Sequence, residues 1–508
     1  MKKALLLISL LCSITASAQQ AALVNESLPN PDNEPMPVHP IPHPRQLKWM
    51  ETEFYAFFHY GMNTYTDKEW GFGSESEKIF APTKVPNPEQ WLSACKKAGM
   101  RGGIAVVKHH DGFCLWPTAT TTHSVKKAGN RNGKQTNIPR DFAAAAQKLD
   151  MKYGFYVSPW DRNSVHYGTQ KYVTDVFLRQ CSELAAYGND QFEMWFDGAN
   201  GGDGYYGGRN CQVKVDRSTY YDVPNLRDTV HAVCPDCVLW GVGGEARWIG
   251  NEDGYAGITN WLTDSRLDGR DQPHAEEGSE DGWFWLPGES DAKGTDKGWF
   301  HHGKGSTYGE EKALTPEQMY KVYMETVGRN ATLILNLPPG RDGLLPDYDV
   351  EALSQLGQLL NTRLGDDADL APTAKITATA TRKGGAERNY DIYNTLDCNT
   401  QTYWATDDDV TTATITIDLE REHPLHYVML QEYIALGQRI RNFHIDTSLD
   451  GISWTERAAD LTTTVGYKRI IPLNGTTREY GDPVPARYLR ITIDSAKACP
   501  TLSRIGIF

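Results

Sequence analysis

Short apolar segments alternate with helix-like segments between residues 54 and 339, and this rhythm restricts the fold more than any other feature. The apolar segments are nearly uninterrupted, as in strands that are covered on both faces of a sheet. Helix-start signals lie between them, for example Asn87-Pro88-Glu89-Gln90, a capping residue before a first-turn proline. The alternation predicts a parallel sheet, open or closed into a (β/α)8-like barrel. The predicted strands are 54–61, 103–110, 152–158, 191–198, 238–244 and 332–339.

Polar side chains follow the predicted strands, where chemistry gathers in a (β/α) barrel. They are His59, the adjacent His109 and His110, Ser158, Asp197 and Glu245. The segment 265–310 interrupts the rhythm, and we expect it to form a long loop over the same face.

The composition changes near residues 365–372. The chain beyond lacks helical periodicity, and 413–419, 426–433, 443–451 and 487–494 alternate as strands between turn signals. This pattern predicts an antiparallel β-sandwich. We therefore expect a barrel-like catalytic domain over 46–365, a linker over 366–372 and a sandwich over 373–508.

The N-terminus has the pattern of a signal peptide over 1–18. Two lysines precede an apolar run over 4–11 that is too short to span a bilayer, and Ala16-Ser17-Ala18 is a small-residue cleavage site. A lipid anchor at Cys12 is the alternative, but the bulky Leu11 before it disfavours that anchor. An extended leader over 19–45 would follow, and the mature chain would be exported to the periplasm or the cell exterior. No later segment is apolar enough to cross a membrane.

Charge and cysteine content exclude two classes of partner. The formal net charge is −14 with no basic run, which argues against nucleic acid, since that partner requires a basic surface. Cys234 and Cys237 could begin a zinc site, but no second pair at that spacing completes it. A local disulfide or two unpaired thiols is the preferred interpretation.

Asp197 is the strongest candidate for catalysis, because it ends the apolar run FEMWF and precedes a glycine-rich turn. A carboxylate there can attack an anomeric carbon, although a helix cap or a loop aspartate is the alternative. Retaining hydrolysis needs a second carboxyl group, for which Glu245, Glu252 and Glu289 are candidates. The neighbouring histidines suit hydrogen bonds to sugar hydroxyls. Adjacent positions on a strand face opposite ways, which argues against one shared metal ion.

Several motifs occur in the order found in one family: FFHYGMNTY, KHHDGFCLW, YGFYVSPWD, EMWFDGANG, RWIGNEDG, GWFHH and TLILNLPPGRDG. With them, residues from about 40 to 365 resemble the family 29 glycoside hydrolases, the retaining α-L-fucosidases. The resemblance implies that Asp197 is the nucleophile. The residues expected to hold the fucose are His59, His109, His110, Tyr156, Trp195 and Arg247, with Trp299 nearby.

RWIGNEDG looks like the subgroup that cleaves α-1,3 and α-1,4 branches, whose acid/base is the glutamate of GNE. This similarity implies Glu252, with Glu289 as the second choice, and a reaction on fucosylated oligosaccharides or glycoconjugates without a metal or organic cofactor. Two alternatives stay open, an α-L-galactosidase on the same fold and a catalytically silent sugar-binding protein.

Residues 373–508 resemble the discoidin-like sandwich of family 32 carbohydrate-binding modules. The match is carried by YNTLD, TYW, SLDGISW and RYLRI. Such domains often hold a structural calcium, here expected at Asp397 in the loop 397–402. Whether the domain binds sugar or packs against the barrel is open at this point.

Overall fold

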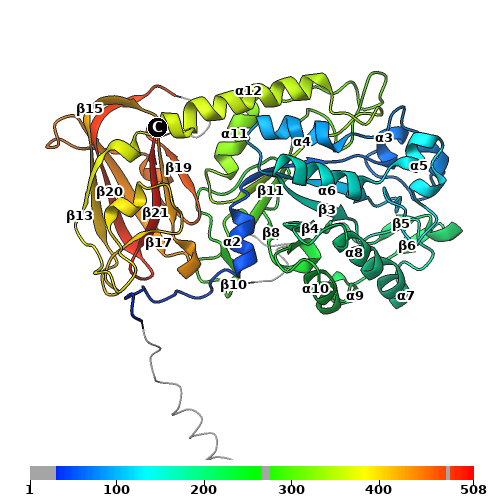
Figure 1. Cartoon of the computed structure of the whole chain (residues 1–508), viewed down its shortest axis with the longest axis horizontal. Helices are drawn as coiled ribbons and strands as arrows, with labels where there is room; N and C mark the ends of the chain where they lie inside the picture. The colour runs from blue at the N-terminus through cyan, green and yellow to red at the C-terminus, as the bar shows by residue number, and fades with distance from the viewer. Residues whose placement is uncertain (1–29, 266–274, 476–480) are drawn as a thin grey trace, which may run out of the picture.

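The computed structural model describes residues 30–265, 275–475 and 481–508. The predicted signal peptide and the first part of the leader lie outside these ranges. The described chain forms a nearly closed barrel followed by a sandwich, and Figure 1 shows the two side by side.

Eight parallel strands build the barrel, in the order β7-β4-β3-β2-β1-β12-β11-β8. Every neighbouring pair is parallel, and β12 closes onto β1. Only β7 and β8 remain unpaired with each other, so residues 241–246 bridge an open seam. The strands are β1 (Phe54–Phe58), β2 (Gly102–Lys108), β3 (Lys152–Val157), β4 (Glu193–Trp195), β7 (Val238–Trp240), β8 (Arg247–Trp248), β11 (Gly288–Lys293) and β12 (Thr332–Asn336).

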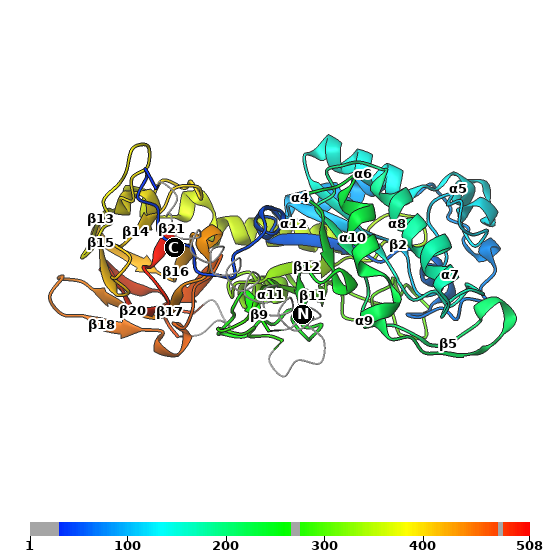
Figure 2. The same ribbon diagram turned by 90° about the horizontal axis from the view of Figure 1, so that it is seen from below.

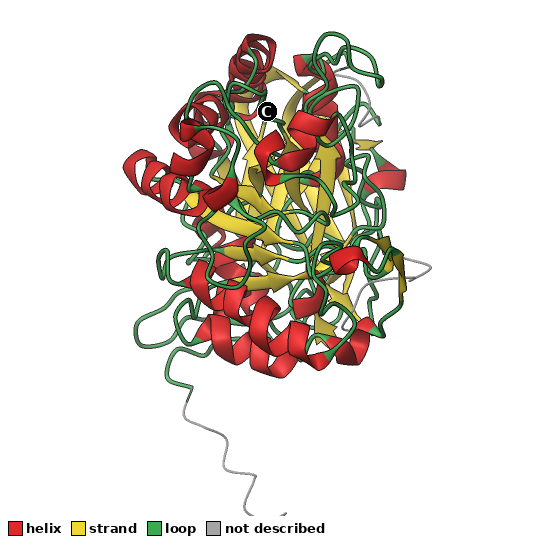
Figure 3. Cartoon of the chain, turned by 90° about the vertical axis from the view of Figure 1, so that its right-hand side faces the viewer, coloured by secondary structure: helices red, strands yellow, loops and turns green. Residues whose placement is uncertain are grey.

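Helices surround the strands, as Figure 3 shows. The predicted helix starts are confirmed, because the Asn87 side chain accepts from the Gln90 backbone and Thr315 forms a capping box with Gln318. The main helices are α2 (Pro44–Met50), α4 (Pro88–Lys97), α6 (Ile138–Leu149), α8 (Leu178–Ala185), α10 (Val223–His231), α11 (Pro316–Thr326) and α12 (Asp347–Leu364). Shorter elements are α3 (Met62–Thr66), α5 (Arg131–Gln135), α7 (Gln170–Tyr172), α9 (Arg217–Tyr220), β5 (Gly202–Gly204), β6 (Cys211–Val213), β9 (Thr263–Asp264) and β10 (Phe284–Trp285).

Side-chain alternation along β1 shows how the barrel fills both its faces. Phe54, Ala56 and Phe58 join the core under the helices, whereas Tyr55 and Phe57 join an aromatic cluster inside the barrel. Successive residues of a strand point to opposite faces, so an uninterrupted apolar run serves two cores.

The expectation of a long loop over 265–310 is wrong in part, because β11 and β10 lie within it. The sequence of β11, GESDAK, has no apolar run. Its Glu289 and Asp291 side chains are nevertheless buried, since each accepts a hydrogen bond from a tryptophan indole. Hydrogen bonding rather than hydrophobicity makes this segment a barrel strand, and hydrophobic periodicity cannot reveal such a strand.

The predicted C-terminal sandwich is confirmed as two antiparallel sheets, ordered β13-β15-β20-β17-β18 and β14-β21-β16-β19. The first sheet contains β13 (Lys375–Ala378), β15 (Ala413–Leu425), β20 (Val484–Ala496), β17 (Ile440–Ser448) and β18 (Thr455–Arg457). The second contains β14 (Trp404–Ala405), β21 (Thr501–Ile507), β16 (Tyr427–Glu432) and β19 (Arg469–Pro472). Ile, Leu and Val side chains of both sheets fill the space between them.

The sandwich is joined to the barrel by apolar and polar contacts. Ile470 and Phe508 belong to the core that lies under the barrel helices. Lys468 Nζ lies 2.6 Å from Glu53 Oε1, and both side chains are largely buried. The side chain of Gln438 accepts from the Leu262 backbone N–H at 2.7 Å. In the turned view of Figure 2 the sandwich lies on the left, and the barrel strands β12, β11 and β2 lie from the middle towards the right.

Two sequence expectations about ligands can be compared with the described residues. Cys234 and Cys237 are unpaired thiols, and the described ranges contain no cluster of three or more His, Cys, Asp and Glu side chains suited to a metal. Asp397 accepts from Asn399 N at 2.8 Å and from the Thr402 hydroxyl at 2.7 Å, so both of its oxygens already have donors within the loop. A calcium site needs six to eight oxygen ligands, and calcium at Asp397 stays a prediction. No helix in the described parts of the chain is long and apolar enough to cross a membrane.

Candidate active site

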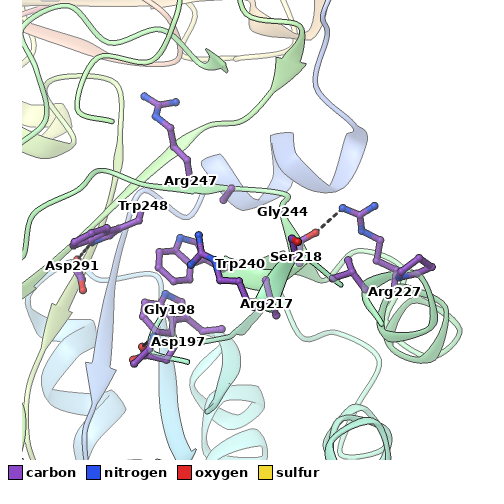
Figure 4. A pocket seen from close by; sticks show the side chains of 18 of the residues that line it. Asp197, Gly198, Arg217, Ser218, Arg227, Trp240, Gly244, Arg247, Trp248 and Asp291 are labelled. Atoms are coloured by element: carbon purple, nitrogen blue, oxygen red, sulfur yellow. Dashed lines mark hydrogen bonds between the residues drawn. The ribbon is translucent and has the colours of Figure 1, made fainter. Parts of the chain in front are cut away.

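A cavity of about 790 Å³ opens at the barrel seam, within the size range of small-molecule sites. Figure 4 shows its lining side chains around the carboxyl end of β4. The lining includes Asp197, Trp195, Trp240, Trp248, Glu252 and Asp291, together with Arg217, Ser218, Val223, Pro224, Arg227 and residues 241–244.

Asp197, the predicted nucleophile, lies two residues after the end of β4 and lines the cavity. Its side chain is 25% exposed. The Ala199 backbone N–H donates to Oδ1 at 2.6 Å, and the Tyr156 hydroxyl donates to Oδ2 at 3.0 Å. Donors on both oxygens orient the carboxylate. Tyr156, expected from the family resemblance to hold the sugar, therefore also positions Asp197.

A glycine after β7 lets the bridging chain approach the residue before Asp197. Gly241 has φ +71°, and a Cβ built on it would lie 2.0 Å from the carbonyl oxygen of Phe196. Any other residue would push the bridging chain away from the end of β4. The turn that lines the cavity therefore needs glycine at this position.

His110 faces Asp197, with Nε2 3.8 Å from Oδ2. Its Nδ1 lies 2.7 Å from the Ser158 hydroxyl oxygen, and that hydroxyl donates its one proton to the Trp160 carbonyl. His110 must therefore donate from Nδ1, which leaves Nε2 as an acceptor. Burial lowers the pKa of His110 to about 4, so the ring is neutral near pH 7.

His59 has the same arrangement on the neighbouring strand. The Asn336 amide donates to the Trp299 carbonyl at 2.8 Å, so its Oδ1 accepts from His59 Nδ1 at 2.7 Å. Burial lowers the pKa of His59 to about 4, and its Nε2 is again an acceptor. Both rings are suited to accept hydrogen bonds from sugar hydroxyls.

His109 lies between these two rings, with ring centroids 4.1 Å from His110 and 5.9 Å from His59. Burial, with the two neighbouring imidazoles, lowers its pKa well below the usual value. The structure thus brings together the three histidines that the sequence indicated, on one side of Asp197.

Glu252 lines the same cavity as Asp197, on a loop between two glycines of positive φ, Gly250 and Gly254. Asn251 holds this loop by donating to the Tyr255 carbonyl at 2.8 Å. The Trp299 indole donates to Glu252 Oε2 at 3.2 Å, and its ring lies 5.1 Å from that of His59. Trp299 therefore links the predicted acid/base to the histidine group.

Glu289, the second choice for the acid/base, is not placed to reach a bound sugar. Its carboxyl group is fully buried and accepts from the Trp195 indole at 2.6 Å and from the Tyr55 hydroxyl. Glu193 lies beside it and accepts from the same hydroxyl at 3.1 Å. Burial raises the pKa of both carboxyls, that of Glu289 to about 7, and they form a buried pair beneath the cavity.

Glu245 and Arg247, which the sequence placed in the site, are held by partners away from Asp197. Glu245 pairs with Arg45 at 3.1 Å and accepts from the Leu239 backbone, outside the cavity lining. Arg247 touches the cavity, but its guanidinium donates to the carbonyls of Leu286 and Ala275. In Figure 4 this group points away from Asp197, so the structure does not bring the Arg247 guanidinium to that carboxylate.

Sequence reasoning missed three kinds of lining residue. Asp291 lies two residues after Glu289 on β11 and accepts from the Trp248 indole at 2.7 Å. Burial, together with the nearby charge of Glu252, raises the pKa of Asp291 well above its ordinary value. Trp240 stacks on Trp195 with ring centroids 3.9 Å apart, which gives the cavity an aromatic wall. Arg217 and Arg227 come from helices outside the strands, where no strand-end signal points to them.

Comparison with known proteins shows the family. Residues 42–363 match the model of the family described as alpha-L-fucosidase. The chain belongs to the α-L-fucosidase family. This family comprises glycoside hydrolases, and residues 375–505 match a second model, the F5/8 type C domain, which agrees with the predicted discoidin-like sandwich.

Similar proteins cover nearly the whole fucosidase chain. Alpha-L-fucosidase 1 of Arabidopsis thaliana is 31% identical over 93% of this chain and 88% of that protein. A family 29 fucosidase of Ruminococcus gnavus, solved in complex with fucose, has a TM-score of 0.80 at 30% identity and covers 94% of this chain and 96% of its own. A glycoside hydrolase 29 family member from an unknown rumen bacterium has a TM-score of 0.77 at 33% identity, over 94% of this chain and 78% of that one.

Proposed function

We propose that this chain is an exo-acting, retaining α-L-fucosidase that removes terminal L-fucose from α-1,3 and α-1,4 branches of glycans. The observation that carries the proposal is that Asp197 and Glu252 line one cavity, each held by a hydrogen bond from an aromatic side chain. Two carboxyl groups on either side of a glycosidic bond are the requirement of this chemistry.

In the first step, the Asp197 carboxylate attacks C1 of fucose and forms an ester bond. Glu252 gives its proton to the glycosidic oxygen, so the bond between C1 and that oxygen breaks and the remaining glycan leaves as an alcohol. In the second step, Glu252 takes a proton from water, the water oxygen bonds to C1, and the ester to Asp197 breaks. Two inversions at C1 retain the configuration.

The side chains around Asp197 would orient the sugar. Neutral His59 and His110 offer Nε2 acceptors to ring hydroxyls, and their low pKa keeps them in this form in neutral and mildly acidic solution. The stacked Trp195 and Trp240 offer an apolar wall to the C–H face of a pyranose. The reaction needs no metal or organic cofactor, because carboxyl groups supply the nucleophile and the proton donor.

The test compares a Lewis-type trisaccharide with α-1,3- or α-1,4-linked fucose, an α-1,2-linked fucoside and an α-L-galactoside, with free sugar measured by chromatography. We expect the branched fucoside to be the best substrate for the wild type, and no release by Asp197→Ala. Asp253→Asn is the matched control, since Asp253 is an exposed carboxylate next to Glu252. Equal release by Asp197→Ala would exclude Asp197 as the nucleophile. A better rate on the galactoside would favour the α-L-galactosidase, and binding without release would favour a sugar-binding protein.

The covalent intermediate has a separate test. A 2-fluoro-fucosyl fluoride slows the second step, so mass spectrometry of the digested protein should find one added sugar on the peptide that contains Asp197. A label on Glu252 or Asp291 instead would reassign the nucleophile. The anomer formed first, followed by NMR, should have the configuration of the substrate.

We also propose that the chain is exported after cleavage before Gln19, on the basis of its N-terminal sequence. N-terminal sequencing of the protein recovered from the periplasm or medium tests this. For the sandwich we propose a packing role, which the Lys468–Glu53 pair and the Gln438 contact support.

A further inference from the structure

The motif GWFHH, residues 298–302, ends in a histidine that the proposed reaction does not use. His302 is fully buried, and its two ring nitrogens face two carboxyl groups from a distant part of the chain. Its Nδ1 lies 2.9 Å from Asp67 Oδ1, and its Nε2 lies 2.6 Å from Glu69 Oε1. One imidazole therefore joins residues 298–302, which we call the Trp299 segment, to the chain that follows α3.

Asp67 is an ionised partner of His302. Its carboxyl group also accepts from the Ser306 hydroxyl at 2.6 Å and from the Thr307 backbone N–H at 2.9 Å. Burial alone would raise the pKa of Asp67, but these hydrogen bonds and the one to His302 outweigh burial and lower the pKa. Because an ionised carboxylate can only accept, His302 Nδ1 is the donor in this contact.

Glu69 connects the same imidazole to the backbone of the Trp299 segment. The Trp299 backbone N–H donates to Glu69 Oε2 at 2.7 Å, and the Phe300 backbone N–H donates to Oε1 at 3.3 Å. The approach is so close that a Cβ built on Gly298 would lie 1.9 Å from Glu69 Oε1 and 2.8 Å from His302 Nε2. His302, Glu69 and the segment backbone thus form one closed ring of hydrogen bonds.

The Trp299 segment brings two aromatic rings to the active site. The Trp299 indole donates to Glu252 Oε2 at 3.2 Å, and no other described residue donates a hydrogen bond to Glu252. This distance is at the long limit for an N–H···O bond, so a small displacement of the indole would break it. The Phe300 ring lies 5.3 Å from that of His59 and 5.0 Å from that of His109.

We propose that His302 is a positioning residue, which holds the Trp299 indole on Glu252 by bonding Asp67 and Glu69 at the same time. Because its ring is fully buried, His302 acts through Trp299 and not on the sugar itself. This inference rests on the proposed function, since it takes Glu252 as the acid that protonates the leaving glycan. Without His302, the Glu252 carboxyl would lose its fixed direction and would protonate the glycosidic oxygen less effectively.

The test compares a Lewis-type trisaccharide with α-L-fucosyl fluoride. Fluoride leaves without a proton from a carboxyl group, so its kcat/KM depends on the nucleophile and on fucose binding but not on the acid. His302→Asn and His302→Gln each keep one contact, because asparagine can place an N–H near the position of Nδ1 and glutamine near that of Nε2. In both variants we expect kcat/KM to fall about 10-fold more for the trisaccharide than for the fluoride, a part of the contribution of a general acid.

Lys304→Gln is the matched control, because Lys304 is an exposed cation two residues after His302. It should leave both values of kcat/KM unchanged. Equal losses on the two substrates in the His302 variants would mean that His302 only stabilises the fold, and this would overturn the proposal. A variant with an unaltered ratio would overturn it too, since both contacts are required.

Hydrogen exchange measures the positioning without reference to activity. Backbone amides of residues 298–311 should exchange about 10-fold faster in the His302 variants, the size of one charged hydrogen bond, and at the wild-type rate in Lys304→Gln. Asp67→Asn gives a second test if the His302 variants do not fold, because the Asp67 side chain is 21% exposed. It should change the ratio and the exchange in the same direction, and Asp67→Asn with His302→Gln should be no worse than the more affected single variant.

The outcomes separate this inference from the proposed function. Unchanged exchange over residues 298–311 in an active His302 variant would overturn the positioning role alone. If the wild type released fucose from neither substrate, the proposed function would be overturned, and the role of His302 in the reaction with it.

Discussion

Replacing Glu289 with glutamine tests how the buried carboxyl pair supports the site. Glu289 and Glu193 are fully buried side by side. Two indoles and the Tyr55 hydroxyl face three of the four carboxyl oxygens, and Glu193 Oε1 is buried without a hydrogen-bond partner among the described residues. In Glu289→Gln, the amide oxygen can still accept from Trp195, and the amide N–H can donate to Glu193. The variant therefore loses no more than about one hydrogen bond, roughly 1 kcal/mol of stability.

The stability of the wild type relative to Glu289→Gln should also depend on pH. Burial raises the pKa of Glu289 from 4.5 to about 7, so the folded state binds a proton that the unfolded state has lost. Between these values the stability from this group is present at low pH and falls as pH rises, by about 1.4 kcal/mol per pH unit. Glutamine resembles the protonated acid and does not titrate. The wild type should therefore lose stability relative to Glu289→Gln between about pH 5 and pH 7, by about 3 kcal/mol at most.

Urea unfolding of both proteins at several pH values from about 5 to 8 measures this difference. His59 and His110 have lowered pKa values and contribute with the opposite sign, since their stability is lost as pH falls below 6.5. Subtracting the variant from the wild type removes their contribution, because it is common to both. A difference that does not change with pH would refute the proton uptake assigned to Glu289.

Activity distinguishes positioning from catalysis in the same variant. Glu289→Gln should retain kcat/KM within about 10-fold, whereas Glu252→Gln should lose about 10²–10⁴-fold, as expected for a general acid. If Glu289→Gln lost as much as Glu252→Gln while remaining as stable as the wild type, the acid/base assignment would be reversed.

Three other changes have defined expectations. Tyr156→Phe removes the donor to Asp197 Oδ2 and should lower kcat about 10-fold with little change in KM; an unchanged kcat would show that Ala199 N–H alone orients the carboxylate. Lys468→Met leaves Glu53 buried with only the exposed Arg101 nearby, 3.7 Å away, and should lower the free energy of unfolding by about 3 kcal/mol in urea. Lys375→Met, at an exposed ion pair, is the control, and equal unfolding midpoints for Lys468→Met and the wild type would mean that the Lys468–Glu53 pair is dispensable. EDTA tests the calcium predicted at Asp397: a drop in Tm that calcium restores would support it, and an unchanged Tm would mean that the hydrogen bonds within the loop suffice.

The sequence predicted those elements whose hydrophobic pattern repeats regularly along the chain. Apolar runs such as 54–58 and 332–336 face two cores at once, so their hydrophobicity alone marked them as barrel strands. Asp197 could be found because it stands at the end of such a run. The alternation of helices and strands in the barrel, and of apolar and polar residues in the sandwich strands, could be predicted for the same reason.

Features that depend on partners distant in sequence could not be predicted. The strand β11 is polar, and its burial depends on indoles from β4 and β8. Arg247 looked like a ligand residue, yet carbonyls of the segment that follows it take its guanidinium. Arg217 and Arg227 reach the cavity only because the barrel stays open between β7 and β8.

The gap between β7 and β8 has an evolutionary consequence. Residues 241–246 are not held by a strand ladder on both sides, so a change in their length costs little more than loop-closure entropy. Asp197 lies two residues beyond β4, a strand that is paired on both sides. Selection can thus reshape the entrance of the cavity while the proposed nucleophile keeps its place, provided that Gly241 stays, since a side chain there would collide with the neighbouring backbone.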